Sequence, residues 1–367
     1  YVGNSGTSTR FLAAALCLAG GNYTLDGTPR MQERPIRDLM GPLQKLGAAI
    51  TCSPTGCPPV QIGPAALAPG TLTVRGDTSS QFLSGLLMML PGLTARGQRR
   101  DTEVRIQGEL VSRPYVDMTL ALMAHFSLRV GNPQAGARSW KILARWSDRE
   151  SIYHCKGGKY DVEPDASSAS YFLAAAAITG GQVCVKDLPA QSLQGDMAFA
   201  ETVLKPMGCT VEHGKKGLTV TGPKGKAGAG AGKGFRTPGL LGIDVDLSGM
   251  PDMAQTLAVT ALFAEGPTTI RGIANLRVKE TDRIAALETE LTRIGAKVTV
   301  DKDSICIDPG SRAYKPVIVK TYDDHRMAMS FALAGLKIPG MQIADPGCVA
   351  KTFPDFFPRW QTMLQGR

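Results

Sequence analysis

The sequence predicts an α/β protein built from several copies of one module, and two recurring patterns carry this prediction. In the first, a short polar turn leads into a run rich in Ala, Leu, Phe and Met, usually followed by Gly and a strand. This pattern begins near Asn4, Gly76, Pro164, Met250 and Tyr322. In the second, a strand, a polar loop, an amphipathic helix and another strand follow one another. The patterns together recur roughly every 70–90 residues, a longer period than that of solenoid repeats.

The second pattern is clearest between residues 268 and 300. Ile284, Leu287, Leu291 and Ile294 recur there at helical spacing, and we expect Gly295 to end the helix. Since the runs of the first pattern are apolar on every side, we expect each copy of the module to bury one helix almost completely.

The length of 367 residues suits two ordinary domains of about 150 residues or more. A hinge-like Glu-Pro-Asp before the third apolar run predicts domains 1–163 and 164–367. The chain starts at Tyr1 inside one copy of the module, so we expect the upstream half of that copy to lie outside this sequence.

Two segments interrupt the pattern. Residues 131–153 read as a variable hairpin or loop, and residues 222–239 are a low-complexity Gly/Lys stretch. The second is not a phosphate-binding loop, because Gly234 follows Lys233 where that motif requires Ser or Thr. We expect it to be a flexible surface insertion.

Composition and charge favour an enzyme that acts on small anions. The formal net charge of +9 suits nucleic acid or small polyanions, but the aromatic residues do not interleave with basic clusters as single-strand binding requires. The eight cysteines form no CxxC pair, and no HExxH, DxDxDG, GxSxG or strand-following GxGxxG motif occurs. The longest apolar runs are shorter than the ~20 residues of a membrane span. We therefore expect no metal, cofactor, nucleic acid or membrane partner.

The starts of the apolar helices are candidate anion sites. Ser, Thr or Asp before such a run is first of all an N-cap, yet the turns NSGTSTR, GDTSSQF and YDDHR carry more polar groups than capping needs. Helix N-termini attract anions, and Arg binds phosphate and carboxylate with two parallel hydrogen bonds. A lone loop Arg is commonly just solvated, but here cations recur at matching places. They are Arg10, Arg30, Arg34, Arg113, Arg277, Lys279, Arg283, Arg326 and Lys351.

Two carboxylates are candidates for acid–base chemistry. Asp252 is the only acid at the start of its apolar helix, and its simpler interpretation is an N-cap. Glu280 follows Lys279 and precedes Arg283 by three residues, so it is either a general acid–base group or half of a surface ion pair.

Ten ordered motifs from one end of the chain to the other resemble those of the EPSP synthase family of enolpyruvyltransferases. They include GNSGTSTRF, PRMQERPIRDL, SSQFLSGLLM, SRPYVDMT, DASSASYFLAAAAITGG, PDMAQTLAV, RVKETDRI, YDDHRMAMSFAL and DPGCVAKTFPDFF. The resemblance implies a two-domain inside-out α/β barrel with three βαβαββ repeats per domain, the first repeat being incomplete here. It also implies transfer of the enolpyruvyl group of phosphoenolpyruvate to the 5-hydroxyl of shikimate 3-phosphate, without metal or cofactor. Phosphate would leave through a tetrahedral intermediate, in the biosynthesis of chorismate and the aromatic amino acids.

The resemblance also assigns roles to particular residues. Asp252 would accept the proton of the 5-hydroxyl, Glu280 would protonate the phosphoenolpyruvate methylene, and Lys279 would assist catalysis beside them. The phosphoenolpyruvate positions are Gly6, Arg34, Gln81, Arg283, Arg326 and Lys351. The shikimate 3-phosphate positions are Ser79, Ser80, Gln81, Ser112, Asp252, Asn275 and Lys279.

The chain departs from the family pattern in three ways. The N-terminal Lys-Ser motif is absent, so we expect the chain by itself to bind both substrates poorly and to turn over little. Phe11 stands where many members have Pro, and Pro164 replaces a common Gly at the interdomain hinge. The family also implies a monomer or one part of a larger polypeptide, in the cytoplasm or a plastid.

Two other functions are considered. An enolpyruvyltransferase acting on UDP-N-acetylglucosamine would carry a reactive Cys just ahead of its Arg-Pro motif, and PRMQERP has none. A non-catalytic paralogue that binds anions or nucleic acid has no need to keep both Asp252 and Glu280 among the cationic loops.

Overall fold

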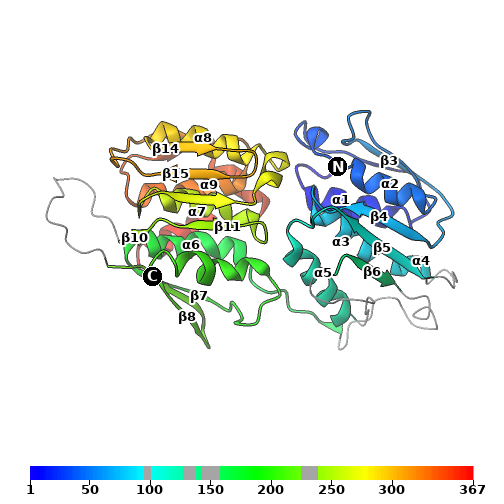
Figure 1. The fold of residues 1–367 in the computed structure, drawn as a ribbon, viewed down its shortest axis with the longest axis horizontal. Coiled ribbons are helices and arrows are strands. Elements are labelled where there is room, and N and C mark those ends of the chain that lie inside the picture. The colour runs from blue at the N-terminus through cyan, green and yellow to red at the C-terminus, as the bar shows by residue number, and fades with distance from the viewer. Residues whose placement is uncertain (95–100, 127–136, 143–157, 225–238, 367) are drawn as a thin grey trace. The chain divides into compact units, whose positions relative to one another are not determined.

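The computed structural model describes residues 1–94, 101–126, 137–142, 158–224 and 239–366 (Figure 1). The chain divides into two compact units, Tyr1–Asp161 and Val162–Arg367, and each has its own hydrophobic core. The domain boundary expected after residue 163 lies two residues from this division. The two interrupting segments lie mostly outside the described residues.

The complete module occurs in the second unit, where two helices accompany a four-stranded sheet. Its elements are, in chain order, β11 (Asp244–Asp246), α7 (Ala254–Ala261), β13 (Thr268–Arg271), α8 (Arg283–Ile294), β14 (Lys297–Val300) and β15 (Ile305–Asp308). The strand order is β11-β13-β15-β14, with β11 parallel to β13 and the other neighbours antiparallel. The βαβαββ repeat implied by the sequence is therefore present here in full.

Two other sets of elements repeat the later part of this module. In the first unit they are α1 (Gly6–Leu16), β1 (Tyr23–Leu25), α2 (Arg37–Lys45), β2 (Ala49–Thr51) and β3 (Val60–Gly63). In the second unit they are α6 (Ala166–Thr179), β7 (Gln182–Lys186), the helical turn Ala200–Leu204, β8 (Thr210–Gly214) and β9 (Gly217–Thr221). The orders β1-β3-β2 and β7-β9-β8 match β13-β15-β14, since the last strand is always central and antiparallel to both neighbours.

The remaining strands form three parallel pairs, which need helical crossovers, and one antiparallel pair. In the first unit these elements are β4 (Thr71–Arg75), α3 (Ser80–Met89), α4 (Pro91–Thr94), β5 (Thr102–Gln107), α5 (Arg113–His125) and β6 (Ser139–Ile142). In the second unit they are β10 (Leu240–Leu241), β12 (Ala264–Glu265), β16 (Ile318–Val319), α9 (His325–Ala332) and β17 (Gln342–Ile343). The pairs β4–β5, β10–β12 and β16–β17 are parallel, and β6 is antiparallel to β5. No sheet in the described residues closes on itself.

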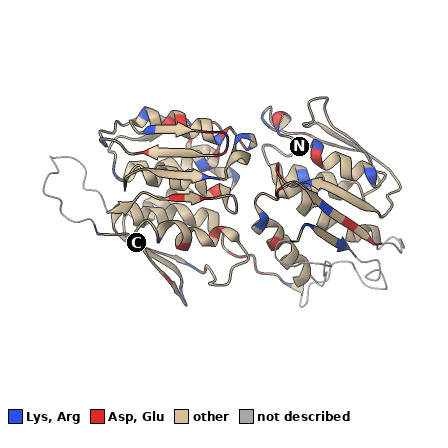
Figure 2. Cartoon of the chain, viewed as in Figure 1, with Lys and Arg blue, Asp and Glu red and all other residues tan. Residues whose placement is uncertain are grey.

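The apolar helices form the centre of each unit. All eight residues of α7 are buried, and α6 is buried over most of its length. Neither helix contains a charged residue, nor does α3. Figure 2 marks the Lys, Arg, Asp and Glu residues of the other elements. The expectation of a nearly fully buried helix is confirmed for these three runs, whereas α1 is buried at only five of its eleven residues.

Local sequence signals fix where several helices begin and end. Asp165 caps α6 by accepting bonds from the backbone amides of Ser167 and Ser168, and Asp282 caps α8 through the amide of Ala285. Gly295 ends α8 in the left-handed region at φ 116°, as its sequence position predicted.

An aromatic cluster joins α10 (Phe356–Leu364) to α6. Phe172 of α6 contacts Phe353, Phe356 and Trp360, with ring centroids between 5.7 and 6.1 Å apart. Trp360 also stacks on Phe356 at 5.5 Å and is only 6% exposed. The buried aromatic area anchors this last helix to the core.

Within the described residues, no helix is both long and apolar enough to traverse a bilayer.

We predict that Trp360→Ala lowers the free energy of unfolding by about 3–5 kcal/mol, because it leaves a large cavity against α6. Urea denaturation followed by circular dichroism measures the change. The neighbouring exposed Gln361→Ala is the control and should change stability by less than about 0.5 kcal/mol. Equal stabilities for the two variants would contradict the anchoring role.

Candidate functional site

Arg283 is the centre of an ion-pair cluster in the second unit. It is the first residue of α8, and its side chain is only 2% exposed. Its Nη1 lies 2.9 Å from Asp252 Oδ1, its Nη2 lies 2.9 Å from Glu280 Oε2, and its Nε lies 2.7 Å from Asp324 Oδ2. Asp252 belongs to the 3-10 turn before α7, Glu280 precedes α8, and Asp324 precedes α9. One guanidinium therefore joins three elements that are distant in the sequence.

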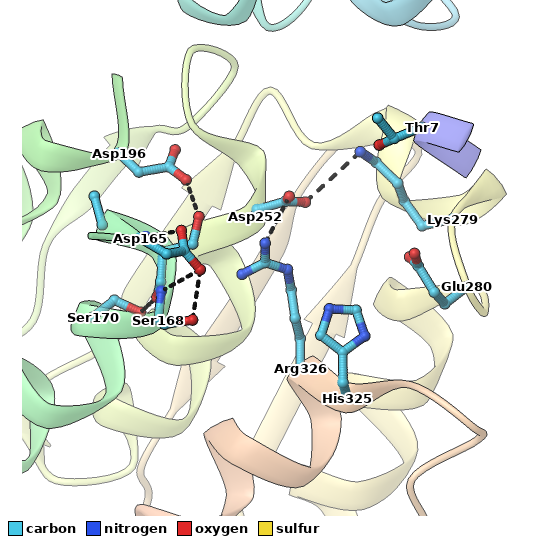
Figure 3. Close-up of polar contacts among 12 residues, drawn as sticks. Thr7, Asp165, Ser168, Ser170, Asp196, Asp252, Lys279, Glu280, His325 and Arg326 are labelled. Atoms are coloured by element: carbon cyan, nitrogen blue, oxygen red, sulfur yellow. Dashed lines mark hydrogen bonds and ion pairs between the residues drawn. The ribbon is translucent and has the colours of Figure 1, made fainter. Parts of the chain in front are cut away.

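Asp252 faces two further cations, and Figure 3 shows it between Lys279 and Arg326. Arg326 Nη2 lies 3.0 Å from Asp252 Oδ2, and Lys279 Nζ lies 3.7 Å from Oδ1. Burial by itself would raise the pKa of Asp252. The charges of Arg326, Lys279 and Arg283 outweigh burial and hold this pKa well below its ordinary value. Asp252 is therefore an ionised carboxylate with little affinity for a proton in this state.

Glu280 pairs with two cations. Its Oε2 accepts from Arg283, and its Oε1 accepts from Lys351 Nζ. The Glu280 side chain is only 10% exposed, so the alternative interpretation as a surface ion pair is wrong. The N-cap interpretation of Asp252 is also wrong, because neither the 3-10 turn that contains it nor α7 has a side-chain cap.

The start of α9 supplies the other side of the cluster. Asp324 caps the helix by accepting from the backbone amide of Arg326 at 2.9 Å, and Arg326 Nη1 also donates to the Tyr171 hydroxyl at 3.4 Å. His325 is 4% exposed, and its Nδ1 has no hydrogen-bond partner among the described residues. Burial and the nearby Arg326 lower the pKa of His325 to about 3, so the imidazole is neutral at pH 7.

The cluster contains more positive than negative side chains. Its cations are Lys279, Arg283, Arg326 and Lys351, and its carboxylates are Asp252, Glu280 and Asp324. Since the histidine is neutral, four cations face three carboxylates. Among the ion pairs of the described residues in this unit, the cations therefore outnumber the carboxylates, which favours the binding of an added anion.

In the first unit, a network of hydrogen-bonded polar side chains joins the N-terminal parts of α1 and α3. The buried Arg10 donates from Nη1 to Gln81 Oε1 at 2.7 Å and to Ser79 Oγ at 3.4 Å, and its guanidinium lies 5.2 Å from the Phe82 ring centre. Gln81 Nε2 donates to Thr7 Oγ1 at 2.9 Å. Ser79 caps α3 by accepting from the amide of Gln81. The side-chain amide of Gln81 is thereby fixed in one orientation.

Gly6 allows Arg34 to lie against the start of α1. A Cβ at Gly6 would stand 2.6 Å from Arg34 Nη2, closer than real atoms approach. Arg34 is itself buried and donates from Nη1 to the carbonyl oxygen of Asn4 at 2.9 Å. A side chain at position 6 would therefore displace this guanidinium.

The structure brings most of the sequence-predicted site residues into these groups. The Arg283 cluster contains Asp252, Lys279, Glu280, Arg283, Arg326 and Lys351, whereas the first unit contains Gly6, Arg34, Ser79 and Gln81. Among the other predicted residues, Ser80 is a buried residue of α3, Ser112 precedes α5 at φ 54°, and Asn275 lies in the 3-10 turn Ala274–Val278.

Sequence reasoning missed Asp324 and Tyr171. Asp324 stands directly before His325 and Arg326 at a helix start, a position that also reads as a simple N-cap. Its ion pair with Arg283 spans 41 residues, and no local pattern reveals that pairing. Tyr171 lies inside an apolar run, where it reads as core.

Known proteins match this chain along nearly its whole length. Residues 1–360 match the family model of EPSP synthase (3-phosphoshikimate 1-carboxyvinyltransferase). Curated 3-phosphoshikimate 1-carboxyvinyltransferases from Nitrosomonas europaea and Paraburkholderia phymatum are 45% and 43% identical, with 98% and 100% of this chain covered. The chloroplastic enzyme of Brassica napus is 47% identical over 97% of this chain. The chain spans 78%, 80% and 66% of these three relatives.

Solved structures agree with the fold. EPSP synthase from Acinetobacter baumannii matches with a TM-score of 0.68 and 25% identity, over 98% of this chain and 77% of that one. The enolpyruvyl transferase NikO from Streptomyces tendae, at 18% identity, has a TM-score of 0.66 over 95% of this chain and 74% of its own. The predicted two-domain fold of repeated α/β modules is confirmed.

We predict that Arg283→Met lowers the free energy of unfolding by about 3–5 kcal/mol, because buried carboxylates lose their partner. Thermal and urea denaturation at neutral pH measure this change. Arg271→Met, which breaks an exposed two-bond pair with Asp244, is the matched control and should shift the midpoint little. Similar shifts for both variants would show that the Arg283 cluster does not stabilise this unit.

Proposed function

The chain belongs to the EPSP synthase family of transferases, and we propose that it transfers the enolpyruvyl group of phosphoenolpyruvate to the 5-hydroxyl of shikimate 3-phosphate, releasing phosphate. The observation that supports this best is the Arg283 cluster. It holds two carboxylates, Asp252 and Glu280, among cations that exceed the carboxylates in number. The relatives that carry this activity by name are 43–48% identical to the chain, and they do not favour the two alternative functions.

Phosphoenolpyruvate has a carboxylate and a phosphate, and we propose that cations of the cluster bind both. The proposed phosphoenolpyruvate residues are Arg283, Arg326 and Lys351 in the second unit, with Gly6, Arg34 and Gln81 in the first. The planar guanidinium groups suit two-bond recognition of such oxyanions. The proposed shikimate 3-phosphate residues are Ser79, Ser80, Gln81, Ser112, Asp252, Asn275 and Lys279.

We propose that Asp252 and Glu280 move the protons of the reaction, with Lys279 beside them. As the 5-hydroxyl oxygen bonds to the central carbon of phosphoenolpyruvate, Asp252 takes the hydroxyl proton and Glu280 gives a proton to the methylene carbon. The resulting tetrahedral intermediate then loses phosphate as its C–O bond breaks, and the phosphate takes up the proton that Asp252 held. Glu280 takes back a proton from the methyl carbon as the double bond re-forms. No step requires an oxidant or reductant.

We infer from the ion pairs how these two carboxylates become active. Asp252 is paired with Arg326 and Lys279, and Glu280 with Lys351, while Arg283 contacts both. The substrate anions must compete for these same cations. When they bind, the carboxylates lose positive charge nearby, and the proton affinity of Asp252 and Glu280 rises. Proton transfer is thereby coupled to occupation of the site.

The chain's partners are proposed to be these two small molecules, in a monomer or one part of a larger polypeptide. Cytoplasmic or plastid location is supported by bacterial and chloroplastic relatives. Sedimentation of the native polypeptide that contains this sequence tests the first point, and cell fractionation tests the second.

We predict that Asp252→Asn and Glu280→Gln each lower kcat by about 10²–10⁴-fold in the full polypeptide that contains this sequence. Phosphate release with both substrates present measures turnover. Glu288→Gln, a partly exposed carboxylate on α8, is the control and should keep wild-type kcat. A wild-type protein that releases no phosphate with both substrates would refute the proposed function, and unchanged kcat in both variants would refute the proposed roles.

We also predict that Arg326→Gln raises the pKa of Asp252 toward its ordinary value, because Arg326 is the cation that lowers this pKa most. In wild type the carboxylate stays ionised well below the usual titration range of Asp, whereas in the variant it takes up a proton at higher pH. Carbon-13 NMR of labelled aspartate follows this titration. If Asp252 titrates at the same pH in the variant as in wild type, the proposed competition between substrate anions and Asp252 for Arg326 is contradicted.

A further inference from the structure

Helix α8 is bonded to the segment 315–324 along its whole length. From the C-terminal end of α8 to its start, Ile294 O accepts from the Lys315 amide at 2.9 Å, and Arg293 Nη2 donates to Ile318 O at 3.1 Å. Glu290 then accepts from the Lys320 amide at 3.3 Å, and Arg283 finally meets Asp324. The segment therefore runs along the same helix that carries the centre of the ion-pair cluster.

Glu290 is a buried carboxylate in the middle of this contact. Its side chain is 0% exposed, and besides the Lys320 amide it accepts from Arg293 Nη1 and from the Tyr322 hydroxyl, the latter at 2.9 Å. A carboxylate is costly to bury unless such donors satisfy it. Nothing in the proposed reaction uses Glu290, so its presence on a packed helix face needs another explanation.

The segment that Glu290 bonds has an unusual backbone. Tyr322 and Asp323 are consecutive residues in the left-handed region, at φ 56° and 54°. Residues other than glycine adopt this conformation rarely, and it persists where surrounding contacts impose it. The Tyr322–Glu290 hydrogen bond is such a contact, and burial together with Glu290 raises the pKa of Tyr322, which keeps its hydroxyl a donor.

Asp324, which follows this turn, contacts both Arg283 and Arg326. Asp324 is fully buried, bonds Arg283 through both carboxylate oxygens, and accepts from the backbone amide of Arg326. If the turn at Tyr322 relaxed, Asp324 would shift. Arg283 would then lose part of its support, and α9 would begin in a different position.

We propose that Glu290 and Tyr322 are positioning residues that hold Asp324, and through it Arg283 and Arg326, in the arrangement that binds phosphoenolpyruvate. The proposal rests on the proposed function for the identity of the ligand. The buried contacts of Glu290, which lies on α8 beyond Arg283, would thereby contribute to substrate affinity. Neither Glu290 nor Tyr322 reaches the proposed substrate-binding side chains directly.

The test uses Tyr322→Phe, which removes one hydroxyl and little else, and Glu290→Gln, which keeps the shape but places an amide among donors. Tyr314→Phe is the matched control. Tyr314 is a partly buried tyrosine of the second unit, whereas Tyr322 is 37% exposed. The Tyr314 hydroxyl donates to the carbonyl oxygens of Leu262 and Pro309, outside the segment 315–324. Tyr322→Phe and Tyr314→Phe each remove one hydroxyl and should lower the melting temperature by similar amounts.

Hydrogen–deuterium exchange gives the first readout and does not depend on activity. The Asp324 amide donates to Thr321 O and the Arg326 amide to Asp324 Oδ1, each at 2.9 Å. In Tyr322→Phe and Glu290→Gln we expect faster exchange in peptides covering 321–327, with no such change in Tyr314→Phe. Exchange identical to wild type in both test variants would overturn the proposal.

Steady-state kinetics of the full polypeptide gives the second readout. We expect the KM for phosphoenolpyruvate to rise about five- to tenfold in Tyr322→Phe and further in Glu290→Gln, while kcat changes less than KM. The double variant should match Glu290→Gln, because both substitutions break one contact. A KM for phosphoenolpyruvate that changes no more than in Tyr314→Phe would show a merely structural role and overturn the proposal.

The two possible failures are distinguishable. A wild-type protein without turnover contradicts the proposed function, and hydrogen exchange alone then decides whether Glu290 and Tyr322 order the segment. Wild-type turnover with unaltered variants contradicts only the positioning role.

Discussion

The second unit depends on one buried guanidinium. Arg283 is charged, almost fully enclosed, and bonded to carboxylates from three separate elements. Each of these charges is costly to remove from water, and the cost is offset only when all partners are in place. The turn before α7, the start of α8 and the start of α9 must therefore be assembled together. Because the same residues make up the candidate site, the geometry of the site follows from the condition that this unit folds.

The repeated module explains why the site forms at these places. In each copy a buried helix begins at a polar turn, so the free N–H groups of its first turn and its flanking side chains lie together. The copies then differ in chemistry. α1 and α3 present Gly6, Gln81 and the buried Arg10, whereas α8 and α9 present a dense group of charges. A common backbone plan therefore carries two different kinds of polar group.

The sequence predicts the local features well and the long-range pairing poorly. Gly295 ends α8 as expected, and the uncharged runs become buried helices, because helical period and terminal signals act over a few residues. Asp252 looked like an N-cap because its spacing is that of a cap, but its partners come from residues 279, 283 and 326. Glu290 reads as part of a solvated helix face, yet tertiary packing buries it completely.

The cations of the site serve two purposes that oppose each other. Without substrate they neutralise Asp252 and Glu280, which stabilises the folded cluster and depresses the pKa of Asp252. In the proposed reaction a bound oxyanion draws on the same positive charges, so Asp252 accepts a proton more readily at the moment when a reacting group is present. A cluster with fewer cations would attract an anion less, and one without Asp252 and Glu280 would lack the carboxylates that are proposed to move protons. Asp324 contacts both Arg283 and the backbone amide of Arg326, so the proposed binding of an anion depends on the same buried carboxylate that holds the cluster together.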